Sequence, residues 1–205
     1  MTDSIGFNPT VSILASGRTN IGGLFASTVA TYGDEIAMVD GERTISFRAL
    51  NQQANQWANA FESQGLSKGD RVAVLARNCL EYLVIELAAA KSGLIVAALN
   101  WRLSDPELAH CINLVSPALI VLQVEYAETV QRLDCEAIPV WSFDEELQSQ
   151  IANQDDEFDL AEIDGEDGLV ILYTSGTTGM PKGALISHRA MIARAAVFAS
   201  DLNLP

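Results

Sequence analysis

The chain has 205 residues, of which 49% are hydrophobic, and its formal net charge at neutral pH is −15. This length suits one large domain or two modest ones, and the apolar content argues against wholesale disorder. The acidic charge speaks against nucleic acid and anionic membranes as partners, since both require basic patches. No apolar stretch reaches transmembrane length, and the first residues lack the pattern of a secretory signal.

The N-terminal third predicts a helix, a hairpin and a second helix. A helical pattern covers about Ile21–Tyr32, and Asp40-Gly41 is typical of the turn of a small β-hairpin. Ser46 is a suitable N-cap for the next helix, and Gly65 marks its end.

The middle of the chain alternates strand-like and helix-like segments. Apolar runs predict strands at residues 71–76, 94–99, 118–124 and 138–143. A helical pattern covers residues 79–92, and a capping box at Ser104 and Glu107 opens another helix that ends near Leu114. Strands separated by helices predict an α/β fold, with a parallel sheet covered by helices on both faces.

The three cysteines, Cys79, Cys111 and Cys135, are widely spaced and form no Cys-x-x-Cys pair. This spacing predicts free thiols in a reducing cytoplasm, where each serves as a small core residue. We therefore expect a cytoplasmic protein.

An acidic segment interrupts the alternation of strands and helices. Residues 153–168 contain eight acidic residues and no basic one, and their spacing does not match an EF-hand loop. Charge runs are usually solvated, so we interpret this one as a connection between two sheet units. We expect a first α/β subdomain at residues 1–150, an acidic linker at residues 151–168, and the start of a second α/β subdomain at residues 169–205.

Residues 173–183, Tyr-Thr-Ser-Gly-Thr-Thr-Gly-Met-Pro-Lys-Gly, combine hydroxyls, glycines and a lysine. Glycines allow backbone N–H groups to approach a ligand, hydroxyls donate hydrogen bonds, and a lysine supplies a positive charge. Together they predict a phosphate-binding loop. The candidate phosphate-binding residues are Thr174, Ser175, Gly176, Thr177, Thr178, Gly179 and Lys182.

Two other interpretations of this loop are weaker. A plain polar turn requires neither four hydroxyls nor a lysine. A Walker A loop continues as Gly-Lys-Ser/Thr into a helix, whereas here Lys182 lies between Pro181 and Gly183 and strand-like residues follow. We therefore expect a loop that joins two strands.

The segment 172–183 resembles the signature loop of the adenylate-forming (AMP-binding) superfamily. Acyl-CoA synthetases, luciferases and the adenylation domains of peptide synthetases belong to it. Residues 44–50, 68–73 and 90–93 are similar to further landmarks of the superfamily, and Asn100-Trp101-Arg102-Leu103 is similar to the form in fatty-acyl-type CoA ligases.

The resemblance implies the N-terminal part of the large domain of an ATP-dependent acyl-CoA synthetase, an enzyme well over twice this length. Such an enzyme uses ATP, Mg²⁺ and CoA to convert a carboxylic acid into an acyl-AMP and then a thioester. Its catalytic, adenine-binding and metal-binding residues are expected beyond Pro205. We therefore name no catalytic residue and no metal ligand here, and expect the 205-residue piece alone to be inactive.

Other readings stay open at this point. The loop could serve a phosphotransferase or NTPase, the chain could be a non-catalytic truncated remnant or nucleotide-binding module, and an aryl-CoA ligase or luciferase-like relative is a further alternative. A structural role is favoured for His110, and for His188 both a helix-start or packing role and a ligand contact stay open. Packing is also the favoured role of Trp101 and Arg102, which alternatively line a route toward the second sheet.

Overall fold

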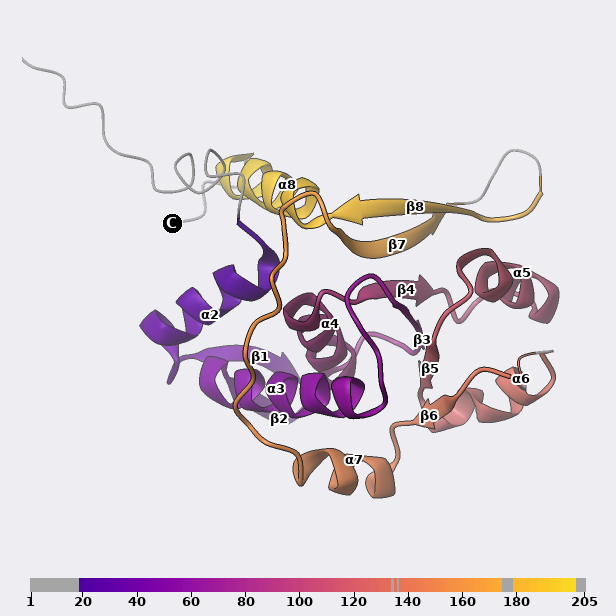
Figure 1. Cartoon of the computed structure of the whole chain (residues 1–205), viewed down its shortest axis with the longest axis horizontal. Helices are drawn as coiled ribbons and strands as arrows, with labels where there is room; N and C mark the ends of the chain where they lie inside the picture. Colours follow the sequence, from indigo (N-terminus) through magenta and orange to yellow (C-terminus); the bar gives the residue numbers. More distant parts are fainter. Residues whose placement is uncertain (1–18, 134, 136, 175–178, 202–205) are drawn as a thin grey trace, which may run out of the picture.

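The apolar runs of the sequence form the strands of one mixed sheet. A computed structural model of the chain describes residues 19–133, 135, 137–174 and 179–201 (Figure 1). Six strands lie in the order β6-β5-β3-β4-β7-β8, all pairs being parallel except β7 with β8. They are β3 (Arg71–Leu75), β4 (Ile95–Leu99), β5 (Leu119–Leu122), β6 (Val140–Ser142), β7 (Gly168–Thr174) and β8 (Lys182–Ser187).

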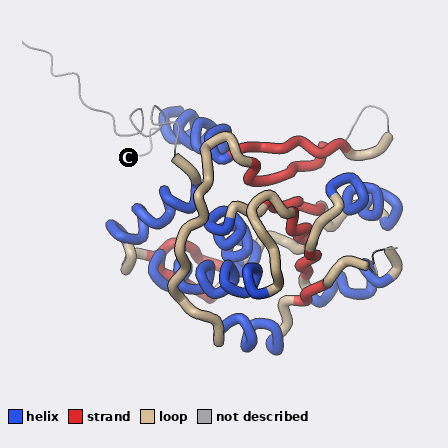
Figure 2. The backbone as a smooth tube through the Cα atoms, in the orientation of Figure 1, coloured by secondary structure: helices blue, strands red, loops and turns tan. Residues whose placement is uncertain are grey.

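Helices occupy most of the connections between these strands (Figure 2). In chain order they are α2 (Ile21–Tyr32), α3 (Phe47–Ser63), α4 (Leu80–Ser92), α5 (Asp105–Val115), the 3₁₀ turn η1 (Val124–Tyr126), α6 (Ala127–Gln131), α7 (Glu145–Ala152) and α8 (His188–Asp201). A separate hairpin of β1 (Ile36–Asp40) and β2 (Arg43–Ser46) precedes α3.

Both faces of the sheet are covered because successive side chains of a strand point to opposite faces. Val72 and Val74 of β3 pack in one apolar cluster with α3 and α4. Ala73 and Leu75 belong to a second cluster, which includes buried residues of α5 and α6. Figure 1 shows the two helix layers on either side of the strands. The predicted parallel sheet with helices on both faces is confirmed.

Local sequence signals set the helix ends as predicted. The Ser46 side chain accepts a hydrogen bond from the N–H of Ala49, and Ser104 forms a capping box with Glu107. Gly93 ends α4 in the left-handed conformation, with φ of 72°. In contrast, α6 and α7 have only five and eight residues. Such short helices show too few turns for a periodic pattern, and the sequence did not predict them.

The strands on either side of the glycine-rich loop extend the first sheet. β7 pairs in parallel with β4, with Val170 beside Val96, and β8 pairs with β7. Both strands belong to the same six-stranded sheet as β3 and β4. β7 pairs with the edge of β4, whose backbone N–H and C=O groups would otherwise have no strand beside them. The division into subdomains stays a prediction.

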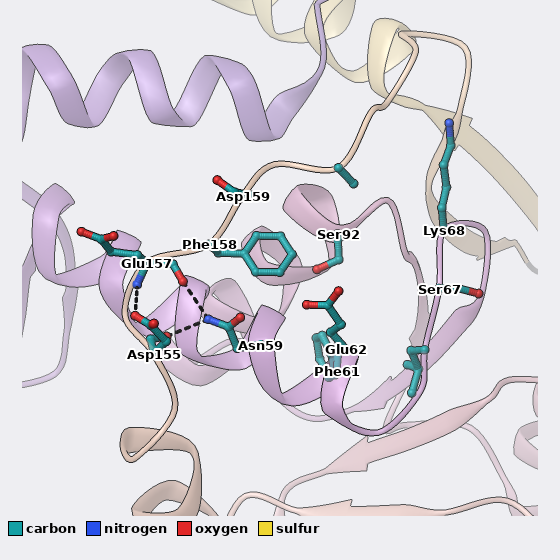
Figure 3. A pocket seen from close by; sticks show the side chains of 12 residues that line it. Asn59, Phe61, Glu62, Ser67, Lys68, Ser92, Asp155, Glu157, Phe158 and Asp159 are labelled. Atoms are coloured by element: carbon teal, nitrogen blue, oxygen red, sulfur yellow. Dashed lines mark hydrogen bonds between the residues drawn. The ribbon is translucent and has the colours of Figure 1, made fainter.

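Residues 153–167, which we call the acidic strap, lie against α3 and connect α7 with β7. The Asn55 side chain donates to the Asp156 carbonyl at 2.7 Å. Asn59 donates to the carbonyls of Asp155 and Glu157, both at 2.8 Å (Figure 3). Gln52 and Gln56 add contacts to Asp156 and Ala152. The strap is therefore held largely through its backbone, while all its acidic side chains except that of Asp167 are exposed.

Four side-chain amides of α3 make these contacts. They stand at positions i, i+3, i+4 and i+7, which lie on one face of a helix: Gln52, Asn55, Gln56 and Asn59. Backbone carbonyls need donors once they leave water, and this amide face supplies them.

Candidate functional site

The predicted phosphate loop joins β7 to β8, as expected. Thr174 ends β7 and pairs with Lys182 at the start of β8, while Tyr173 pairs with Gly183. Ser175, Gly176, Thr177 and Thr178 lie outside the described residues. Because the loop connects two antiparallel strands, no helix N-terminus stands directly behind it, in contrast to a Walker A loop.

Two further loop residues lie in the described part. Gly179 has φ of 102° and a Cβ there would meet no atom within 4 Å, so backbone conformation and not space requires glycine. Lys182 is exposed, and none of the described carboxylates forms an ion pair with it. Its ammonium group is therefore available to an anionic ligand.

Helix α5 contacts both arms of this loop. His110 Nε2 lies 3.0 Å from the carbonyl oxygen of Pro181, and the Tyr173 hydroxyl donates to the carbonyl of Cys111 at 3.0 Å. Burial raises the pKa of Tyr173, so its hydroxyl stays protonated. The predicted structural role of His110 agrees with this contact, but the contact partner had no signal in the sequence.

His188 has a packing role at the first turn of α8. Its side chain is fully buried, and Nδ1 accepts a hydrogen bond from the backbone N–H of Ile21 at 3.1 Å. Burial lowers the pKa of this imidazole, which favours the neutral form that can accept. The structure therefore places His188 between α8 and α2, away from solvent.

Two arginines flank the indole of Trp101 after β4. The guanidinium carbons of Arg77 and Arg102 lie 4.6 and 4.8 Å from the ring centroid. β3, β4 and β7 are parallel, so this stack and the glycine-rich loop both follow strand ends at the same edge of the sheet. Ligands of open α/β sheets bind at that edge.

A separate pocket of about 630 Å³ lies between the C-terminal part of α3 and the acidic strap (Figure 3). Its lining includes the carboxylates of Glu62, Asp155, Glu157 and Asp159, with Lys68 as the basic residue. Acidic walls repel polyphosphates, and Lys68 already forms an ion pair with Asp167 at 2.7 Å. We therefore exclude this pocket as the nucleotide site.

Comparison with known proteins decides the family. The family model described as "AMP-binding enzyme" matches residues 25–203. The chain belongs to the AMP-binding enzyme family. That assignment agrees with the resemblance found in the glycine-rich loop, and it covers the sheet, both helix layers and the loop.

Relatives of this AMP-binding chain include ligases that act on fatty acids. It is 32% identical, over 78% of its length, to the fatty acid–[acyl-carrier-protein] ligase ScoC of Streptomyces coeruleorubidus, covering 31% of that protein. It is 28% identical, over the same share, to the long-chain-fatty-acid–CoA ligase FadD13 of Mycobacterium tuberculosis, covering 33% of it. The chain thus spans about a third of the length of these relatives.

A solved structure confirms the architecture. The inhibitor-bound N-terminal domain of FACL13 from Mycobacterium tuberculosis superimposes with a TM-score of 0.82 at 27% identity, over 88% of this chain and 47% of that one. Among the described residues of this AMP-binding chain, no helix is long and apolar enough to cross a membrane.

Proposed function

We propose that this chain forms the phosphate-binding, N-terminal part of an ATP-dependent acid–thiol ligase, an acyl-CoA synthetase acting on a fatty-acyl-like acid. The observation that carries the proposal is the strand-loop-strand unit of β7 and β8, in a chain of the AMP-binding family, with a Lys182 that forms no ion pair with any carboxylate in the described part of the chain. The relatives named above support a fatty acid as the substrate class, and an aryl acid stays the alternative.

The proposed reaction has two steps. A carboxylate oxygen attacks the α-phosphorus of ATP, the bond to the bridging oxygen breaks, and pyrophosphate leaves with the electron pair. The sulfur of a thiol then attacks the acyl carbon of the acyl-AMP, the thiol proton is lost, and AMP leaves. CoA is the proposed thiol, and the name of ScoC makes the thiol of a carrier protein the other option.

The loop addresses the main barrier to the first step, which is the approach of one anion to another. Two unit charges about 4 Å apart repel by ~1 kcal/mol in water and by ~4 kcal/mol in a partly shielded site. Preorganised donors at the β- and γ-phosphates lower this repulsion and stabilise the leaving pyrophosphate. The proposed donors are the hydroxyls of Thr174, Ser175, Thr177 and Thr178.

The other loop residues have complementary roles. Gly176 and Gly179 allow the backbone to approach the phosphates, and Lys182 neutralises their charge. We propose that Mg²⁺ arrives with the nucleotide, because phosphate oxygens are the hard ligands that it prefers. Among the described residues, no group of three or more His, Cys, Asp or Glu side chains could hold a metal ion, and we assign no metal ligand there.

A cytoplasmic location is part of the proposal. Cys79 and Cys111 are free thiols, and Cys111 is buried. Free thiols are typical of reducing compartments, where CoA thioesters are also formed and used.

Substitution of Lys182 tests the proposal. Lys182→Ala should weaken the binding of Mg·ATP to the complete protein at least about tenfold, since a hydrogen bond to a charged group contributes about 1.5–3 kcal/mol. Lys68→Ala is the matched control: it removes the same charge at a surface ion pair remote from the loop, and should leave binding within about twofold. Equal affinities of the wild type and Lys182→Ala would refute the assignment.

Product analysis tests the reaction class in the complete protein. Adenylation yields AMP and pyrophosphate, whereas a phosphotransferase yields ADP. Release of ADP with transfer of the γ-phosphoryl group would overturn the ligase proposal.

A further inference from the structure

Two neighbouring residues of α5 hold the two arms of the phosphate loop. Tyr173, at the end of β7, donates its hydroxyl proton to the carbonyl of Cys111. The carbonyl oxygen of Pro181, the residue immediately before β8, lies 3.0 Å from His110 Nε2. One turn of a single helix therefore contacts the chain where it enters the loop and where it leaves it.

The chemistry of the His110 contact fixes the direction of the hydrogen bond. A carbonyl oxygen only accepts, so Nε2 must carry the proton that it donates to Pro181. Both the Nε2–H tautomer and the imidazolium meet this condition. The Pro181 carbonyl belongs to the planar peptide that ends at the nitrogen of Lys182. Holding that oxygen therefore sets the orientation of the peptide from which the Lys182 side chain departs.

The closeness of β8 to α5 supports the same arrangement. A Cβ on Gly183 would lie 3.0 Å from Ile171 Cγ2 and 3.5 Å from Leu114 Cδ2 of α5. Pro181 is itself buried, although Met180 and Lys182 on either side of it are exposed. Pro181 is therefore held in place between two exposed residues.

α5 keeps its place without His110. Leu108, Cys111 and Ile112 are buried at 1% exposure or less in the cluster beneath the sheet, whereas His110 is only half-buried. The imidazole is therefore not needed to attach α5 to the sheet.

We infer that His110 is a positioning residue for Lys182: it acts with Tyr173 as a clamp that fixes both arms of the phosphate loop to α5. The expected effect on nucleotide binding rests on the proposed function. The clamp itself can be tested without nucleotide.

The test uses the whole 205-residue chain with two substitutions at one position. His110→Phe keeps an aromatic ring and removes the donor, and His110→Gln returns an N–H near the position of Nε2. The first readout is the initial rate of tryptic cleavage after Lys182 in native buffer without nucleotide, measured by mass spectrometry. Cleavage after Lys68, in the loop before β3, is the internal control.

In His110→Phe we expect cleavage after Lys182 to accelerate about fivefold, as loss of one hydrogen bond of ordinary strength predicts. Cleavage after Lys68 should not change, and His110→Gln should return the Lys182 rate to within about twofold of wild type. Tyr173→Phe, which removes the other contact, should also accelerate cleavage after Lys182. The second readout is the dissociation constant of Mg·ATP for the complete protein, which should rise about fivefold in His110→Phe.

The outcomes separate the clamp from the proposed function. Equal cleavage after Lys182 in wild type and His110→Phe would overturn the clamp, as would an equal acceleration at Lys68, which indicates global destabilisation. Faster cleavage at Lys182 alone, with the dissociation constant of Mg·ATP for the complete protein unchanged in His110→Phe, would uphold the clamp and count against the proposed role of the loop in nucleotide binding.

Discussion

Asn55 joins the buried Lys91 to the acidic strap, and its replacement tests how the strap is held. Asn55 is 5% exposed; its Nδ2 donates to the Asp156 carbonyl at 2.7 Å, and its Oδ1 accepts from Lys91 Nζ at 2.6 Å. Asn55→Ala removes one neutral hydrogen bond, of about 1 kcal/mol, and one to a charged donor, of about 1.5–3 kcal/mol. We expect the free energy of unfolding to fall by about 3 kcal/mol.

Urea unfolding followed by tryptophan fluorescence measures this loss, because the rings of Trp57 in α3 and Trp141 in β6 pack with their centroids 6.1 Å apart. In a Lys91→Met background the charged hydrogen bond is already absent, so Asn55→Ala should cost only about 1 kcal/mol. Gln53→Ala is the matched control: it removes an exposed amide of α3 and should change stability by less than about 0.5 kcal/mol. An equal cost of Asn55→Ala in both backgrounds would refute the reasoning.

Three further predictions concern α4 and its end. Burial lowers the pKa of Lys91 from 10.5 to about 8, so between these values the unfolded chain binds more protons and the free energy of unfolding rises with pH. The rise is about 3 kcal/mol, and pH-dependent urea unfolding of Lys91→Met should lack it. Burial raises the pKa of Glu86 from 4.5 to about 7, so the free energy of unfolding should fall as pH rises between these values. Glu86→Gln, which keeps the shape of the side chain, should remove this pH dependence. An unchanged pH dependence of unfolding in the variant would contradict the assignment. Gly93→Ala forces a side chain into the left-handed region and within 3.0 Å of Lys68 Cγ, and should lower stability by about 1–2 kcal/mol; an unchanged urea midpoint would contradict this.

Local signals in the sequence predicted much of the fold. The helix Ile21–Tyr32 has the predicted bounds, and Ser46 and the Ser104–Glu107 capping box act where expected. Each of these depends on residues three or four positions apart. The glycine-rich loop connects two strands as predicted, because the strand-like residues on either side of it adjoin it in the sequence.

Contacts between distant residues had no such signal. The partners Asn55 and Asp156 are 101 residues apart, and His110 and Pro181 are 71 apart. Every residue type has a backbone carbonyl, so a side chain that binds one places no requirement on the identity of its partner. The sequence therefore does not indicate which residues form such a contact. The amide face of α3 was visible as a repeat of Asn and Gln, and would have suggested a polar partner but not which one.

The place of β7 in the sheet has a consequence for synthesis of the protein. β4 ends at Leu99, but its neighbour β7 starts only at Gly168, about 70 residues later. At typical translation speeds the nascent chain therefore waits roughly 4–14 s with one side of β4 open on the ribosome. During that interval the side of β4 that later pairs with β7 offers unpaired N–H and C=O groups to other chains. Residues 95–99 are therefore a segment where chaperone binding would reduce co-translational aggregation.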